Sequence, residues 1–159
     1  MTTFAPADPD YEARVRESFT RLAFMRTIGA RLLKVAPGEA EIDVAVRDEL
    51  TQQHGYVSAA IVTAIVDAAC GYAAMSLVPA GTGVVTVEYK VNFMSPARGE
   101  RLLAHGRVVK AGRALTVCAG EVHALTDAAP KAVATMLGTM AAIQGAAEVP
   151  VQPSRRISS

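Results

Sequence analysis

The chain has 159 residues, a length that suits one domain with a hydrophobic core. Its 51% hydrophobic and 19% charged residues exclude an intrinsically disordered chain. The formal net charge of +1 indicates neither nucleic acid nor a membrane as a partner, so a bound anion would need a local group of cations.

The start of the chain has no basic stretch followed by an apolar run, so we expect no secretory signal and a cytoplasmic protein. Cys70 and Cys118 lie far apart, in apolar runs and without motif spacing. This usage favours buried free thiols in a reducing compartment, with a disulfide as the alternative.

The first third of the chain predicts one helix and two strands. Apolar residues recur at helical spacing over residues 9–25, which indicates an amphipathic helix. Residues 29–35 and 39–46 are expected to be strands, joined by a turn at Pro37-Gly38. The second strand alternates cleanly, and Asp43 falls on its polar side.

Residues 57–78 contain no Lys or Arg and are long enough to resemble a membrane span. Asp67 near the middle, the Ala and Thr content and the absence of basic flanks favour a buried helix that ends at Pro79. Four further strands are expected, at residues 84–93, 101–109, 114–125 and 131–143. We expect residues 1–143 to form a single domain and residues 144–159 to be a disordered tail.

This order of elements predicts an α+β fold with an antiparallel sheet wrapped around one long central helix. The helix has no wholly polar face, so it needs a sheet on one side and a second cover elsewhere. The apolar surface that remains suggests that the protein forms oligomers.

Four stretches of the sequence, at residues 52–57, 65–74, 86–97 and 99–100, together carry a resemblance. Over about residues 24–143 the chain resembles hotdog-fold acyl-CoA thioesterases of the phenylacetic-acid-degradation (PaaI-like) type. The resemblance implies a homodimer or a dimer of dimers (a homotetramer) with active sites at the dimer interface. It also implies hydrolysis of acyl-CoA without a metal or a cofactor, because CoA is part of the substrate.

The resemblance is incomplete at the start of the central helix. The family has His-Gly-Gly there and an acidic residue nine positions after the His, whereas this chain has Ser58-Ala59-Ala60 and then Asp67. The family's amide and hydroxyl side chains correspond to Gln52 and Thr86. A non-catalytic acyl-CoA-binding protein is therefore the main alternative to a thioesterase. A hotdog hydratase is a third, with less resemblance.

Asp67 is the candidate catalytic carboxylate. Burial of an unpaired carboxylate costs several kcal/mol, and none of its neighbours on the helix is a cation. In a cleft, partial desolvation would raise its basicity, so that it deprotonates water or attacks the thioester carbonyl. The alternative is a structural Asp that bonds a backbone group or Thr63.

The geometry of the central helix indicates whether residues 58 and 67 can belong to one site in a single subunit. Nine residues of helix span about 13.5 Å and two and a half turns, so positions 58 and 67 point in opposite directions. They can serve one reaction centre only if they come from different subunits. The backbone N–H of Ala59, at the helix N-terminus, would polarise the thioester oxygen. Ser58 is expected to be the N-cap.

Three further side chains have two interpretations each. His54 either replaces the missing His or packs against Tyr56. Gln52 either orients substrate or water, or is an ordinary loop residue. Thr86 either holds the lytic water or is an ordinary strand residue.

Cations at strand ends or turns, together with one inside a strand (Lys90), are the candidates for the CoA phosphates, with a solvated surface position as the alternative for each. They are Lys90, Arg98, Lys110 and Arg113. His105 and His123 lack partners at metal-ligand spacing, so no metal site is expected.

Overall fold

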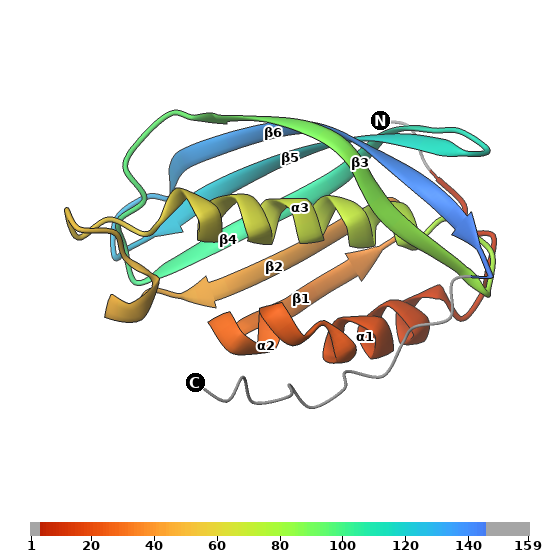
Figure 1. The fold of residues 1–159 in the computed structure, drawn as a ribbon, viewed down its shortest axis with the longest axis horizontal. Helices are drawn as coiled ribbons and strands as arrows, with labels where there is room; N and C mark the ends of the chain where they lie inside the picture. The colour runs from red at the N-terminus through yellow and green to blue at the C-terminus, as the bar shows by residue number, and fades with distance from the viewer. Residues whose placement is uncertain (1–3, 146–159) are drawn as a thin grey trace, which may run out of the picture.

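The computed structural model describes residues 4–145 and has a six-stranded antiparallel sheet wrapped around one helix, α3 (Ala59–Met75) (Figure 1). The strand order is β1-β2-β4-β5-β6-β3, which leaves β1 and β3 at the edges. The bounds are β1 (Ala30–Ala36), β2 (Glu39–Ala45), β3 (Thr82–Phe93), β4 (Arg101–Ala111), β5 (Leu115–Leu125) and β6 (Lys131–Gln144). The expected α+β architecture is confirmed.

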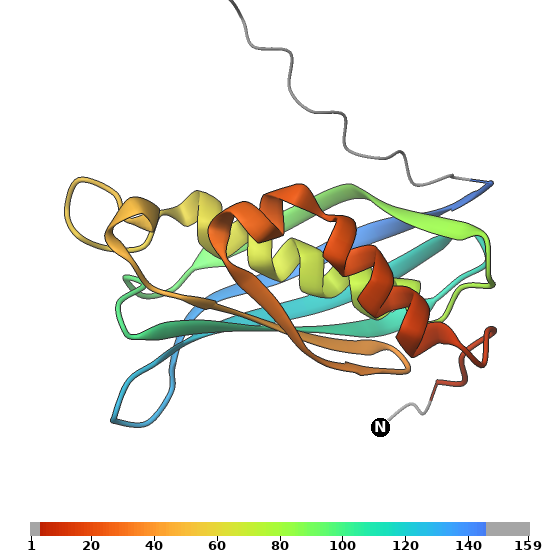
Figure 2. The ribbon, with the colours of Figure 1, turned by 90° about the horizontal axis from the view of Figure 1, so that it is seen from below.

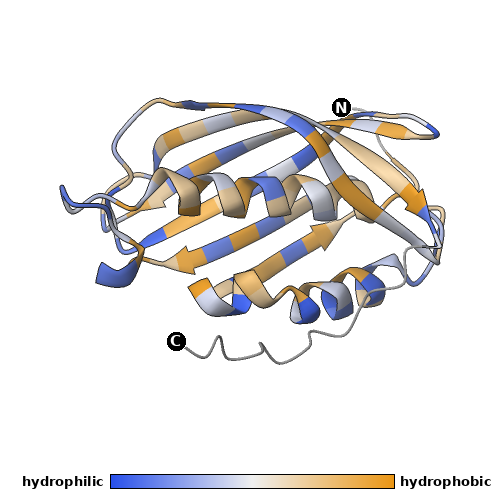
Figure 3. Cartoon of the chain, viewed as in Figure 1, coloured by the Kyte–Doolittle hydropathy of each residue, from blue (hydrophilic) through white to orange (hydrophobic). Residues whose placement is uncertain are grey.

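The hydrophobic core lies between α3 and the concave side of the sheet. Alternation along the strands, visible in Figure 3, turns apolar side chains of β2 and β4 toward the helix. The helix approaches the sheet closely at two glycines. A Cβ atom at Gly106 would lie 2.3 Å from the carbonyl carbon of Ala69, and one at Gly120 would lie 2.4 Å from Val66. These glycines let α3 lie directly on β4 and β5.

The N-terminal segment forms two helices instead of the single helix expected over residues 9–25. They are α1 (Tyr11–Arg21) and α2 (Ala23–Ile28), and Leu22 between them has an extended ψ of 92°. The expected N-terminal helix is therefore confirmed, but its extent as one unbroken helix was wrong. The apolar spacing continues through the break and gives no sign of it. Both helices lie beside α3 on the same side of the sheet, so that α3 runs between them and β3 (Figures 1 and 2).

The C-terminus of α3 is fixed by polar contacts that the sequence did not indicate. The helix ends at Met75, before the expected stop at Pro79. The buried Ser76 hydroxyl donates to the Ala73 carbonyl (2.7 Å) and accepts from the Gly38 N–H (2.8 Å). This ties the helix end to the β1–β2 turn, where Gly38 has a φ of 79°.

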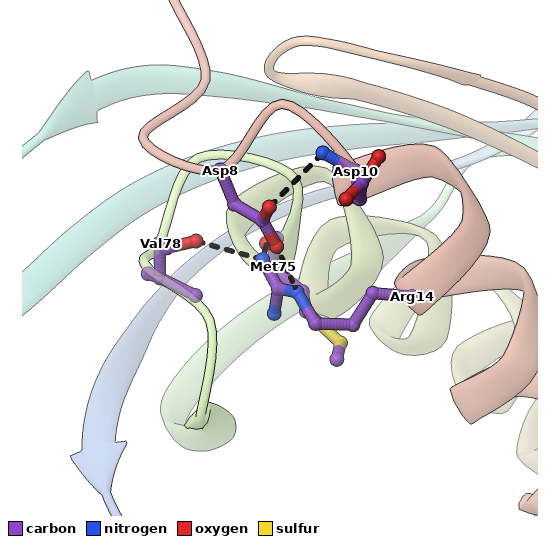
Figure 4. A network of polar contacts seen from close by, with 5 residues as sticks. All are labelled: Asp8, Asp10, Arg14, Met75 and Val78. Carbon is purple, nitrogen blue, oxygen red and sulfur yellow. Dashed lines mark hydrogen bonds and ion pairs between the residues drawn. The ribbon is translucent and has the colours of Figure 1, made fainter.

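A second contact joins α1 to the same end of α3 (Figure 4). The Arg14 guanidinium donates to the carbonyls of Val78 (2.7 Å) and Met75 (3.3 Å). Its Nε donates to Asp8 (2.8 Å), which also accepts from the Asp10 N–H (3.0 Å). These bonds satisfy carbonyls that a helix C-terminus leaves free, and they hold α1 against α3.

Asp43 is buried on the outer side of β2, although the alternation placed it on the polar side of the strand. Arg31 of β1 donates to it through two nitrogens (3.0 and 2.8 Å), and Arg101 of β4 donates from its Nε (2.7 Å). Burial alone would raise the pKa of Asp43. The two guanidinium groups outweigh burial and hold this pKa below its ordinary value.

We expect Asp43→Asn to lower the free energy of unfolding by about 1–2 kcal/mol at neutral pH, because it removes the buried charge that two partly exposed guanidinium groups bind. Because the folded pKa is lowered, Asp43 contributes its stability above the unfolded pKa and loses it as pH falls through the folded value. Denaturant titrations at neutral and acidic pH should show the difference from wild type shrinking in acid. Asp48→Asn, at an exposed position, is the control and should change stability by less than about 0.5 kcal/mol.

Three other expectations concern the termini, the cysteines and the long apolar segment. Strand β6 extends to Gln144, one residue into the expected tail, and residues 146–159 lie outside the described part. Cys70 and Cys118 are free and buried, which raises the pKa of both thiols. Over residues 4–145, every helix is too short or too polar to cross a membrane.

Candidate active site

Asp67 opens into a cavity of about 420 Å³ on the side of α3 that the sheet leaves uncovered. One side of the cavity is formed by α1 and α2, with Leu22, Phe24 and Met25, and the other by residues 83–86 of β3. Most of the lining is apolar, so the Asp67 carboxylate faces a largely hydrophobic space. This composition suits a ligand with an apolar body and one reactive polar group.

Thr86 lines the same cavity and is hydrogen-bonded directly to Asp67. Its hydroxyl donates to Asp67 Oδ1 at 2.7 Å, and Met140 Sδ lies 3.4 Å from the same hydroxyl. A hydroxyl has one proton, and the carboxylate is the stronger acceptor. The predicted acid and hydroxyl are therefore brought together, and the bond to Thr63 proposed as the alternative is absent among the described contacts of Asp67.

Burial raises the pKa of Asp67 above its ordinary value, and the hydrogen bond from Thr86 only partly offsets this rise. Within residues 4–145 no Lys, Arg or His forms an ion pair with Asp67. The ionised carboxylate is therefore a stronger base than an exposed Asp, which suits removal of a proton from water.

We expect Thr86→Val to lower turnover about tenfold, because the mutation removes the hydrogen bond that orients the Asp67 carboxylate and stabilises its ionised form. Its loss should raise the pKa of Asp67 further and move the acid limb of the pH–rate profile to higher pH. Thr86→Ser keeps the hydroxyl and is the matched control. An acid limb at the same pH in Thr86→Val and wild type would contradict this role.

Gln52 and Ala59 border a second cavity, of about 390 Å³, at the opposite end of β3. Phe93 and Met94 line it from the strand end. The Gln52 side-chain oxygen accepts from the His54 N–H, while its amide nitrogen has no partner among the described residues. Because Gln52 lines the cavity, this amide is a candidate donor to a bound ligand.

The start of α3 has the predicted N-cap. The Ser58 hydroxyl accepts from the Ala60 N–H at 3.3 Å, and Ala59 is the first residue of the helix. The N–H of Ala59 has no acceptor within residues 4–145. A free N–H at a helix N-terminus is a donor for a developing negative charge.

His54 and the four candidate cations are spread over the molecule. His54 is exposed, contacts the Gln53 amide and lines neither cavity. The Arg98 guanidinium lies 4.6 Å from the centre of the Tyr56 ring, beside the Gln52 cavity. Lys90 lines a hollow formed by β3, β5 and β6, whereas Lys110 and Arg113 lie at the β4–β5 turn.

Within one chain, the predicted residues therefore form two groups. Asp67 and Thr86 lie in one cavity, and Gln52 and Ala59 line the other. Sequence reasoning missed the contribution of α1 and α2 to the Asp67 cavity, because an amphipathic pattern does not reveal which element a helix packs against. In the described part of the chain, acidic, His and Cys side chains nowhere gather in threes as a metal site requires.

Comparison with known proteins gives the family. Residues 54–131 match the thioesterase superfamily. A thioesterase family protein of Silicibacter pomeroyi is 46% identical, with a TM-score of 0.83 over 85% of this chain and 99% of that one. A Halobacterium salinarum protein that is named as an esterase is 30% identical over 70% of this chain and 79% of that protein.

The PaaI protein from the phenylacetic acid degradation operon of Escherichia coli has the same fold. It is 19% identical, with a TM-score of 0.75 over 86% of this chain and 95% of that one. The chain belongs to the thioesterase superfamily, and it is a thioester hydrolase with the hotdog fold.

Proposed function

We propose that this protein hydrolyses acyl-CoA thioesters, with Asp67 as general base or nucleophile at a site shared by two subunits. The observation that carries the proposal is the position of the Asp67 carboxylate in an apolar cavity, where it accepts a hydrogen bond from Thr86. Burial there raises the pKa of this carboxyl group. The cavity would take the acyl group. The thioester carbonyl would then lie next to the carboxylate.

The chemistry has two forms. As a base, Asp67 takes a proton from water while the water oxygen bonds to the thioester carbon and the C–S bond breaks. As a nucleophile, Asp67 itself displaces the CoA thiolate, and water then hydrolyses the mixed anhydride. Both forms release a carboxylic acid and free CoA. In both forms Thr86 orients the reacting carboxylate.

The shared site is supported by the position of β3. This strand is an edge of the sheet and has half-exposed apolar side chains at Val85, Val87, Tyr89 and Phe93. An edge strand has unpaired backbone N–H and C=O groups, and together with exposed apolar side chains these favour pairing with a second chain. Residues 83–86 of β3 line the Asp67 cavity, and Phe93 lines the other.

Antiparallel pairing of two β3 strands around a twofold axis near Tyr89 would set Val85 opposite Phe93 of the partner subunit. The Asp67 cavity of one subunit would then face the Gln52 cavity of the other. The Ala59 N–H of the partner subunit would donate to the thioester oxygen as negative charge develops there. Gln52 of the partner subunit would hold the substrate or the water.

Arg98 is the cation best placed for CoA, because it lies on Tyr56 at the rim of the Gln52 cavity. A guanidinium group can bind phosphate through two hydrogen bonds, and its contact with the ring reduces its freedom in advance. Lys90, Lys110 and Arg113 lie away from both cavities, and they have no comparable support.

The test is thiol release from acyl-CoAs between acetyl and palmitoyl, together with phenylacetyl-CoA and benzoyl-CoA. Acyl-N-acetylcysteamine thioesters with the same acyl groups form the second arm. Turnover of some acyl-CoA, with kcat/KM at least tenfold above its short-thiol analogue, supports the proposal. Equal kcat/KM values for an acyl-CoA and its N-acetylcysteamine analogue would overturn the proposal that the protein recognises the CoA part of the substrate. Binding of acyl-CoA without any hydrolysis would favour the non-catalytic alternative that Ser58-Ala59-Ala60 suggested.

A further inference from the structure

Gly71 occupies a position in α3 that needs no glycine for folding. A glycine inside a helix costs about 1 kcal/mol relative to alanine. The φ of Gly71 is not positive, and a Cβ built there would meet no heavy atom within 4 Å. Gly106 is the opposite case, because its Cβ would collide with the Ala69 backbone at 2.3 Å. Neither packing nor backbone conformation explains Gly71.

Gly71 lines the Asp67 cavity, one helical turn after Asp67 itself. Met75 lines the same cavity one turn further on. From Asp67 to Met75 the helix rises about 12 Å, at about 1.5 Å per residue. The empty space beside Gly71 therefore lies between the carboxylate and the far end of the cavity, which Leu22 and Met25 also line.

We propose that Gly71 determines which acyl groups this enzyme accepts, by leaving open the passage through which a medium-length acyl tail runs from Asp67 toward Met75. The inference rests on the proposed function, since it takes the Asp67 cavity as the acyl site. An extended alkyl chain advances roughly 1.3 Å per carbon, as C–C bonds of about 1.5 Å require. The 12 Å passage then holds about nine carbons.

The volume of the cavity agrees with this length. A dry cavity of about 150 Å³ binds benzene, which has six heavy atoms. By this measure, about 420 Å³ holds roughly seventeen heavy atoms. Nine carbons, the thioester group and a water molecule fit within that number, whereas a palmitoyl group with the same additions exceeds it. The acyl groups that fit are therefore medium chains and arylalkyl groups of similar length.

The test uses alkyl-CoA thioethers from ethyl to hexadecyl, which bind without being hydrolysed, in titration calorimetry. For wild type we expect affinity to rise about fourfold per methylene, the factor that corresponds to about 0.8 kcal/mol, and to level off near nine carbons. Gly71→Leu should level off about four carbons earlier. It should lower decyl-CoA affinity at least 30-fold more than ethyl-CoA affinity. Gly71→Ala should shift the plateau by about one carbon and should unfold at the same or a higher temperature.

Ala13→Leu, at an exposed position of α1 outside the cavity, is the matched control and should reproduce the wild-type plateau. Equal plateaus in wild type and both Gly71 variants would overturn the role of Gly71. If wild-type affinity does not depend on alkyl length, the Asp67 cavity is not the acyl site. If thioethers bind as expected but no acyl-CoA is hydrolysed, only the proposed reaction falls.

Discussion

Asp67→Asn is expected to lower turnover of the best acyl-CoA substrate by about 10²- to 10⁴-fold, the usual range for loss of a general base. Asparagine has almost the same shape as aspartate, and its side-chain oxygen can still accept the bond from Thr86. It cannot take a proton from water or displace a thiolate. Initial rates of thiol release at saturating substrate measure the effect.

The same substitution should leave stability unchanged or raise it at neutral pH. Burial raises the pKa of Asp67, so the folded protein binds this proton more tightly than the unfolded chain. Stability therefore falls as pH rises from the unfolded pKa through the higher folded pKa. Asparagine has no such dependence. Thermal unfolding between acidic and neutral pH should show wild type losing stability relative to the variant as pH increases.

Asp48→Asn makes the same change of charge at an exposed position and should keep activity within about twofold of wild type. Asp67→Asn with more than a tenth of wild-type turnover would rule out Asp67 as base or nucleophile. Loss of activity together with a much lower unfolding temperature would instead indicate a structural Asp.

The sequence predicted most of the fold because its signals were periodic. Alternation in the strands, the long segment without Lys or Arg and the turn at Gly38 all follow from local backbone preferences. The order of these elements predicted the wrapped sheet, and the resemblance to thioesterases indicated Asp67 and Thr86 as site residues. Neither predicted the pairing of Asp67 with Thr86 by a hydrogen bond. That pairing joins α3 to β3, and no local pattern specifies it.

The features that the sequence did not predict depend on contacts between distant segments. Asp43 is buried because strand register sets Arg31 and Arg101 on either side of it, whereas alternation alone made it a solvent-facing residue. The break at Leu22 lies within an uninterrupted apolar pattern. The open space at Gly71 is visible only once α1, α2 and β3 are in place around α3.

Ala59→Pro is expected to reduce turnover about 10²- to 10³-fold by removing one backbone N–H, the usual cost of a lost oxyanion donor. Proline is well tolerated at the first position of a helix, which is the position of Ala59 in α3. The preceding residue, Ser58, already has the extended backbone that a following proline requires (φ −57°, ψ 138°). The helix should therefore form normally. Ala59→Gly keeps the N–H and is the matched control.

A shared site makes a stronger prediction for a mixture of two inactive variants. If Asp67 works with Ala59 of the partner subunit, a dimer of one Asp67→Asn chain and one Ala59→Pro chain has one intact site and one doubly altered site. Random exchange puts half of the chains into such dimers, so the mixture should regain about a quarter of wild-type activity. A site within one chain would leave the mixture as inactive as its components. Unfolding and refolding the two proteins together ensures that subunits exchange, and a differently tagged wild-type pair measures that exchange. Recovery to a quarter would establish that the two cavities of this chain are halves of one active site.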